Sequence, residues 1–208
     1  MNEVSFIIMA SKRETKKEIT RQKLIEAASL EFAEVGFARA NVSRISERAG
    51  FAAGTVYNYF RSKHDLLLQV VEHAMERLTE TIRSNISDLD DPVERAKRAI
   101  REDFRFMEQN EALSKVIVRE GFAADPMKQK EFLEALAPVS GIFVEILEQG
   151  KQEGLFRPDL DSVWATVLAE GMVAYMLLAR WVLESSELTY DHMAELTIQC
   201  FIEGVLAK

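Results

Sequence analysis

The sequence predicts an all-α protein. Residues that favour helices, such as Leu, Ala, Glu and Arg, are abundant, whereas the 208 residues include 9 Gly and 4 Pro. Apolar residues recur at helical spacing along most of the chain, and Gly and Asp-Pro signals interrupt these runs. We therefore expect about nine helices in one continuous chain with two functional parts.

The first three helices are expected to form an N-terminal head. Leu24, Ala28 and Phe32 share one face of a helix over about residues 14–35, which ends at Gly36. Two short helices follow, at about 41–49 and 55–60, and meet at a tight Ala-Gly corner at 49–50. Asn41 precedes the first of these helices and is placed to cap it.

The remaining helices begin at recognisable capping signals. Ser62 and Asp65 have the spacing of a capping box, and Asp91 followed by Pro92 is a strong helix start. Six further helices are expected, at residues 62–85, 92–108, a stretch that ends at Gly121, 126–153, 160–184 and 190–206.

The second short helix is rich in groups that suit a nucleic acid. Val56 and Phe60 lie four residues apart and predict its buried face. Its solvent side then carries Thr55, Tyr57, Asn58 and Tyr59, with Arg61 and Lys63 at the end. Hydroxyl, amide and cationic groups bind phosphates and base edges, so the pattern predicts a helix-turn-helix with its second helix in the major groove.

Charge divides the chain in the same way. Residues 1–63 carry 11 Lys+Arg and 7 Asp+Glu, a net of +4, whereas residues 64–208 carry 15 and 27, a net of −12. A basic head on an acidic body would approach DNA in one orientation. A candidate arm for phosphates or the minor groove, with a solvated basic helix end as the alternative, consists of Lys12, Arg13, Lys16, Lys17, Arg21 and Lys23.

Residues 49–67, which read A-G-F-A-A-G-T-V-Y-N-Y-F-R-S-K-H-D-L-L, resemble the signature of the TetR family of bacterial transcription regulators. The resemblance covers roughly the first third of the chain. Ala52 and Ala53 depart from it, because the family often has a hydroxyl cap and a polar residue there. Loss of a hydroxyl cap costs about 0.5–2 kcal/mol. We therefore expect a recognition helix that frays in its first turn and reads DNA mainly through residues 55–59.

This resemblance implies three segments and a set of DNA contacts. Residues 1–11 would be a disordered or additional extension, 12–61 a DNA-binding domain with its motif at about 41–60, and 62–208 a helical effector-binding and dimerisation domain. Contacts with double-stranded DNA are expected from Ser43, Arg44, Thr55, Tyr57, Asn58, Tyr59 and Lys63. Arg44, Tyr57 and Lys63 are placed for phosphates, and Asn58 and Tyr59 for base edges or sugars.

The central helices concentrate bulky apolar side chains. The resemblance suggests that some of them line a cavity for a small hydrophobic effector, although ordinary core is the other interpretation. The candidates for ligand binding are Phe104, Met107, Phe122, Phe132, Phe143, Glu170, Met172, Tyr175 and Met176. Glu170 would orient a cationic or hydroxylated group, or else form an ion pair.

The last two helices are apolar on more than one face, which indicates burial on several sides. By resemblance they would pair with those of a second copy, and the alternative is a monomer core. The expected interface residues are Trp164, Leu178, Trp181, Leu196 and Cys200. A homodimer would place its recognition helices about 34–36 Å apart, which suits a palindromic operator.

Several function classes lack support in the sequence. His64, His73 and His192 do not have metal-ligand spacing, and catalytic or nucleotide-binding motifs are missing, so an enzyme, a metal or a cofactor is not expected. The single cysteine fits a reducing cytoplasm. The apolar run over 162–183 contains Glu170 and Arg180, which argues against a membrane span.

The sequence therefore predicts a ligand-responsive DNA-binding regulator, more often a repressor than an activator in the TetR family. Two alternatives stay open. One is a constitutive helix-turn-helix protein without a ligand, and the other is a helical small-molecule or lipid carrier.

Overall fold

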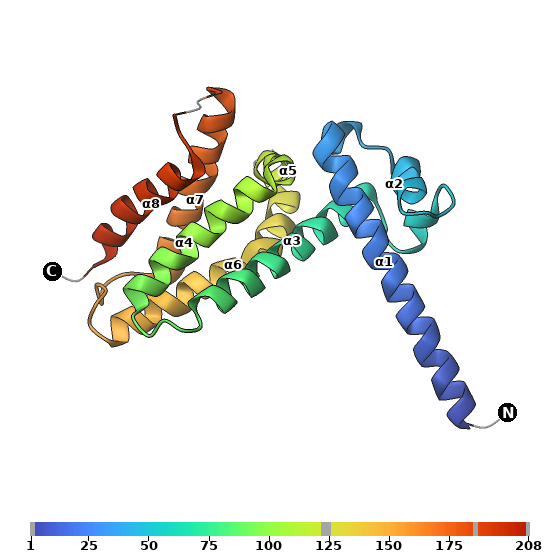
Figure 1. Cartoon of the computed structure of the whole chain (residues 1–208), viewed down its shortest axis with the longest axis horizontal. Helices are drawn as coiled ribbons and strands as arrows, with labels where there is room; N and C mark the ends of the chain where they lie inside the picture. Colours follow the sequence, from blue (N-terminus) through green and yellow to red (C-terminus); the bar gives the residue numbers. More distant parts are fainter. Residues whose placement is uncertain (1–2, 122–125, 185–186, 207–208) are drawn as a thin grey trace. The chain divides into compact units, whose positions relative to one another are not determined.

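The computed structural model describes residues 3–121, 126–184 and 187–206. Within these ranges it contains eight α-helices and one 3₁₀ turn, which confirms the all-α prediction (Figure 1). The elements are α1 Glu3–Arg39, α2 Val42–Arg48, η1 Thr55–Asn58, α3 Lys63–Ile86, α4 Pro92–Gln109, α5 Glu111–Gly121, α6 Pro126–Gln152, α7 Ser162–Val182 and α8 Tyr190–Val205. They form two compact units, Met1–His73 and Ala74–Lys208.

The first unit is built on α1. Its buried face carries Leu24, Ala28 and Phe32, as the periodicity predicts. The regular helix is interrupted at Gly36, whose φ of 77° and ψ of 158° lie outside the helical region. Glycine has no Cβ and adopts this conformation without strain. At its other end α1 begins at Glu3 and not near residue 14, so it includes most of the predicted extension.

The recognition element that follows α2 is short. Asn41 caps α2 by accepting a 2.8 Å hydrogen bond from the Ser43 N–H, as predicted. The predicted helix over 55–60 is one 3₁₀ turn whose N-cap, Gly54, has a φ of 86° and no side chain to accept a hydrogen bond. The Val56 N–H donates instead to the buried Ser46 hydroxyl at 3.3 Å.

Helix α3 passes from the first unit into the second. Ser62 accepts a hydrogen bond from the Asp65 N–H at 3.0 Å, and the Asp65 carboxylate accepts one from the Arg61 N–H at 2.7 Å. The two compact units divide between His73 and Ala74, inside α3, and the domain boundary at residues 61 and 62 stays a prediction. The first eleven residues of α3 belong to the first unit, where, for example, His73 bonds Gln22 of α1 at 3.1 Å.

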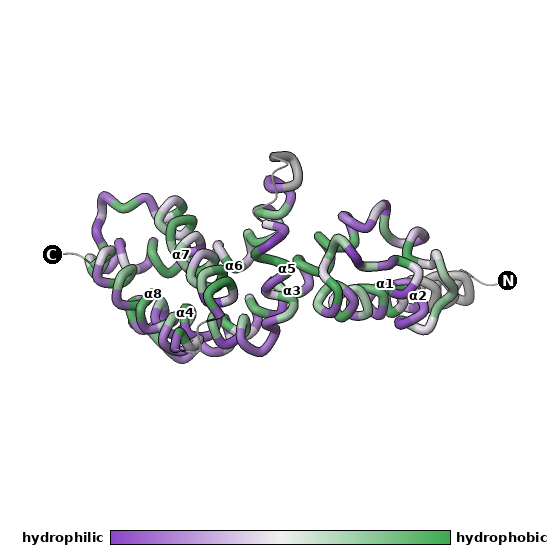
Figure 2. Tube along the Cα trace, turned by 90° about the horizontal axis from the view of Figure 1, so that it is seen from above, coloured by the Kyte–Doolittle hydropathy of each residue, from purple (hydrophilic) through white to green (hydrophobic). Residues whose placement is uncertain are grey.

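The second unit is a helical bundle. Helix α4 packs against α8 and α6, α7 packs against α6 and α8, and α5 contacts α4, α6 and α7. Hydrophobic and hydrophilic residues alternate along these helices, as expected for amphipathic packing (Figure 2). Its fully buried side chains include Leu78, Ile82, Phe104, Ile142, Ile146, Phe156 and Leu177.

The connection after α6 is fixed by one close approach. The Gly150 carbonyl oxygen accepts hydrogen bonds from the N–H groups of Leu155 and Phe156, at 2.8 and 3.1 Å. The buried Phe156 ring lies so near Gly150 that a Cβ atom at position 150 would meet its Cδ2 atom at 2.1 Å. The Arg157 N–H then donates to the Val205 carbonyl at 2.9 Å, which joins this connection to the end of α8.

Candidate functional site

The helix-turn-helix of the first unit exposes most of the side chains predicted to contact DNA. Tyr57 is 60% exposed, and Ser43 and Asn58 are also exposed. Tyr59 is half-buried beside Phe60, while Val56 and Phe60 are buried as predicted. Thr55 is half-buried, and its hydroxyl donates to the Ala52 carbonyl at 2.7 Å.

A buried carboxylate holds α2 in place. Glu31 on α1 is fully buried and lies 3.6 Å from the exposed guanidinium of Arg44, with one oxygen 3.5 Å from the Asn41 N–H. Burial of a carboxylate is costly without a positive partner. Arg44 therefore stabilises the fold and also presents a positive charge to solvent.

The Lys63 side chain makes hydrogen bonds within the first unit. Its ammonium donates to the carbonyl oxygens of Phe37, Ala38 and Ala40 at 2.9, 3.1 and 3.2 Å. These carbonyls follow the break at Gly36, where helix-terminal C=O groups need donors. All three ammonium protons thus have acceptors inside the first unit. The phosphate contact assigned to Lys63 from the sequence stays a prediction.

Helix α1 brings basic residues next to the recognition turn. Lys17 and Arg21 line one hollow together with Asn58 and Tyr59. The Arg21 guanidinium lies 5.8 Å from the centre of the Phe60 ring, which fixes its approach to η1. These two cations belong to the predicted basic arm, whereas the side chains of Lys12 and Arg13 lie outside those that the structure describes.

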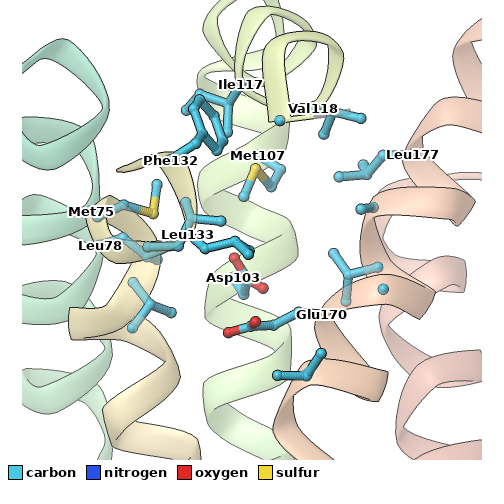
Figure 3. Close-up of a pocket in the computed structure, with 17 residues that line it drawn as sticks. Met75, Leu78, Asp103, Met107, Ile117, Val118, Phe132, Leu133, Glu170 and Leu177 are labelled. Carbon is cyan, nitrogen blue, oxygen red and sulfur yellow. The ribbon is translucent and has the colours of Figure 1, made fainter. Parts of the chain in front are cut away.

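The second unit contains a partly open cavity of about 260 Å³. Five helices, α3 to α7, contribute its lining, which is mostly aliphatic, aromatic and methionine side chains (Figure 3). Protein interiors are normally packed to crystal density, so an apolar space of this size is unusual in a core without a ligand. Leu133 and Val167 line it and are 62% and 43% exposed, so they mark its edge.

Two carboxyl groups face into this apolar space. Asp103 comes from α4 and Glu170 from α7, and Figure 3 shows their carboxylates close to each other. The Ser140 hydroxyl on α6 donates to Glu170. Burial, with a smaller contribution from Glu170, raises the pKa of Asp103 from 3.8 to about 7. Burial also raises the pKa of Glu170, and the Ser140 hydrogen bond opposes this shift.

Some of the residues predicted to bind a ligand line the cavity, and others do not. Met107, Phe132 and Glu170 line the cavity. Phe104 and Phe143 are buried but do not line it, and Tyr175 is 70% exposed. Met172 and Met176 are half-buried outside the lining, and Met176 sulfur accepts a hydrogen bond from Thr197. Phe122 lies outside the described residues.

Sequence reasoning missed Asp103. The residue lies four positions after the buried Ala99 and four before Met107, so it shares their helix face. This spacing could have predicted that the Asp103 carboxylate lies on the inner side of α4.

Helix α7 presents a second apolar surface to solvent. Its large exposed hydrophobic side chains, with fractions from 38% to 70%, are Val163, Trp164, Val167, Leu168, Tyr175, Leu178 and Val182. Of the residues predicted at the dimer interface, Trp164, Leu178 and Cys200 are exposed, while Leu196 and Trp181 are half-buried. The Trp181 indole N–H donates to the Tyr190 hydroxyl at 3.3 Å.

Among the described helices, α7 is also the one long and apolar enough to cross a membrane. Its most apolar window has a mean hydropathy of 1.5, and 28% of that window is buried within the chain. The helix carries Glu170 in the cavity and Arg180, which donates to the Leu188 carbonyl at 2.6 Å. These interactions fit a bundle helix with one face left open.

A chain whose first unit presents a helix-turn-helix and whose second contains an apolar cavity has the architecture of a DNA-binding transcriptional regulator. The family profile "Bacterial regulatory proteins, tetR family" matches residues 24–70, and "Tetracyclin repressor-like, C-terminal domain" matches residues 89–205. The protein belongs to the TetR family, and it is a DNA-binding transcriptional regulator and not an enzyme.

Named relatives and solved structures agree with this classification. The transcriptional repressor KstR2 of Mycobacterium tuberculosis is 28% identical over 68% of this chain and 71% of its own length. The fatty acid metabolism regulator protein of Bacillus subtilis is 24% identical over 89% and 95%.

Two FadR structures superpose with a TM-score of 0.78. The fatty acid degradation regulator FadR of Bacillus halodurans is 26% identical and covers 89% of this chain and 95% of its own. FadR of Bacillus subtilis, in complex with stearoyl-CoA, is 24% identical and covers 88% and 98%.

Proposed function

We propose that the protein is a homodimeric cytoplasmic repressor that leaves a palindromic operator when a small, largely hydrophobic effector binds. The cavity of the second unit carries this proposal, because an apolar space of about 260 Å³ is a ready-made ligand site. The complex of Bacillus subtilis FadR with stearoyl-CoA supports fatty-acid derivatives as the first effectors to test.

Operator contacts would come from the exposed side of the helix-turn-helix. Tyr57 and Asn58 project most freely from η1, and Ser43 and Arg44 flank them on α2. Thr55 and Tyr59 would add contacts at the edges of this surface. Because η1 is one turn long, we expect base recognition to rest on few residues and phosphate contacts from Arg44, Lys17 and Arg21 to supply much of the affinity.

Pairing of two copies would cover the open face of α7. A contiguous exposed apolar surface on a soluble chain marks an interaction site. Trp164, Leu168 and Tyr175 are each at least 66% exposed, and aromatic residues of this kind anchor interfaces. A two-fold pair through α7 and α8 would also supply two recognition elements for a palindrome.

The switch would run through α3. Met75 and Leu78 line the cavity, and the same helix begins at Lys63, which bonds to the end of α1. An effector that favours one position of α3 would change DNA affinity by linkage.

A mobility-shift assay on DNA that flanks the gene tests the proposal. The dimer should bind one palindromic fragment, and acyl-CoAs or other apolar ligands should weaken this binding. Ala174→Phe, which fills the cavity from α7, should retain DNA binding and lose the response. Undiminished binding with every ligand that demonstrably occupies the cavity would instead support a constitutive DNA-binding protein.

A further inference from the structure

The cavity has an apolar lining that is interrupted by two acidic side chains. Every lining side chain is apolar or lacks polar atoms, except those of Asp103 and Glu170. No nitrogen-bearing side chain is found among the described lining residues, so no cation balances these carboxyls inside the cavity.

Apart from Ser140, the described side chains around the carboxyl pair are apolar. The faces that α3, α5 and α6 turn to the cavity are apolar, with Met75, Ile117 and Phe132 as examples. Ser140 satisfies one oxygen of Glu170. The Asp103 carboxylate has no hydrogen-bond or ion-pair partner within the part of the chain that the structure describes.

An unpaired carboxylate in an apolar site costs stability, and the cost is relieved when a donor arrives. A wholly apolar ligand would displace water from the pair and offer nothing in exchange. A carboxylate ligand would add a third acidic group, and like charges at short range repel strongly in such an environment.

We propose that Asp103 and Glu170 form a polar subsite that selects apolar molecules bearing a protonated amine or a hydroxyl and rejects those bearing a free carboxylate. This inference rests on the proposed effector site and names its ligand class. An amine would place its cation between the two carboxyls, and a hydroxyl would donate to whichever carboxyl is ionised.

Three probes with the same chain separate these possibilities: octylamine, 1-octanol and octanoate. Calorimetric titration into the full chain without DNA at pH 7 should show octylamine binding at least about tenfold more tightly than octanoate, with 1-octanol between them. Octylamine binding should also release a fraction of a proton, because Asp103, with a pKa of about 7, is partly protonated at pH 7 and the cation displaces that proton. Titrations in two buffers with different ionisation enthalpies measure that release.

Isosteric amides test the residues. Asp103→Asn and Glu170→Gln should each weaken octylamine binding by about tenfold or more, and the double variant should bind octanoate better than the wild type. Glu108→Gln is the matched control, because Glu108 lies on the same helix α4, is exposed and does not line the cavity. It should leave all three affinities unchanged.

Two results would overturn the subsite: octanoate binding as tightly as octylamine, or the two amide variants retaining full octylamine affinity and proton release. Other outcomes test the proposed function independently of the subsite. If octylamine binds as expected but the operator complex survives, the subsite stands and its role as effector site fails. If an acyl-CoA releases the operator while octylamine does not bind, the regulator stands and the subsite fails.

Discussion

The Lys63 ammonium lies 4.8 Å from the centre of the Phe37 ring and donates a 2.9 Å hydrogen bond to the Phe37 carbonyl oxygen. Lys63→Ala would remove the ammonium donor from that carbonyl and from those of Ala38 and Ala40. Hydrogen bonds to a charged group contribute about 1.5–3 kcal/mol. We expect urea unfolding to show a loss of about 2 kcal/mol, while Arg61→Ala, at an exposed neighbouring position, changes stability by less than about 0.5 kcal/mol.

Salt dependence distinguishes this structural role from a phosphate contact. Removing one phosphate-binding cation lowers the log-log salt slope of DNA binding by about 0.9. We expect that change for Arg44→Ala and no change for Arg98→Ala, an exposed position in the acidic second unit, and Lys63→Ala decides between the two roles of Lys63. A lower slope for Lys63→Ala would confirm its predicted phosphate contact, whereas an unchanged slope with lower stability would leave Lys63 with the structural role alone. The folded fraction of Arg44→Ala needs checking, because Arg44 lies 3.6 Å from buried Glu31.

Asp103→Asn should make stability less dependent on pH. In the native protein the pKa of Asp103 is raised from 3.8 to about 7, so the folded state holds a proton that the unfolded state releases. The wild type is therefore destabilised as the pH rises through this window, and the full penalty is present above about pH 7. One pKa unit corresponds to about 1.4 kcal/mol, so the variant should gain at most about 4 kcal/mol over the wild type at pH 8.

The two proteins should be nearly equal in stability at pH 4, where Asp103 is protonated in the folded state. Denaturant unfolding at pH 4, 6 and 8 measures the difference. A constant difference across this range would mean that Asp103 does not titrate in the cavity.

Gly150→Ala should destabilise the second unit. The added Cβ would meet the Phe156 ring at 2.1 Å, and Phe156 is fully buried. Overpacking of this kind costs about 1–3 kcal/mol, which exceeds the helix-propensity gain of about 1 kcal/mol from Gly to Ala. Gly141→Ala is the control on the same helix, since a Cβ there meets nothing within 4 Å. It should raise the melting temperature slightly, so the two variants should shift in opposite directions.

Trp164→Glu should weaken self-association. Trp164 is 66% exposed on the open face of α7, and a charge there would be buried without a partner in any pair formed through that face. Analytical ultracentrifugation should show a dimer for the wild type and a raised dissociation constant for the variant. Leu30→Glu makes the same type of change on the first unit, where Leu30 is 56% exposed, and should leave the dimer intact. Equal association of both variants would place the interface elsewhere.

Local signals predicted the helices well. Asn41 and Asp91 cap α2 and α4 through their own side chains, and Gly36 interrupts α1, because each of these features depends on a few neighbouring residues. The length of η1 was harder to predict, because the spacing of Val56 and Phe60 fits a 3₁₀ turn followed by a bend as well as a helix.

The lining of the cavity could not be predicted from local sequence patterns, because it depends on how the helices pack. Helix α4 packs against α5, α6 and α8 and also faces the cavity, so apolar spacing alone does not separate the inner Met107 from the core Phe104. Helix α7 likewise has two apolar faces, and Tyr175 lies on the one that is exposed among the described residues. Asp103 and Glu170 are 67 positions apart in the sequence, and only the bundle brings them together.

Val167 both lines the cavity and lies on the open face of α7. Under the proposed function, α7 would serve ligand capture on one side and pairing on the other. The two equilibria would be linked thermodynamically if the effector binds the monomer and the pair with different affinities. The apparent potency of an effector would then depend on protein concentration, with dilute and concentrated samples giving different Kd values. Comparisons among effectors would be meaningful at one fixed concentration, chosen well above the dissociation constant of the pair.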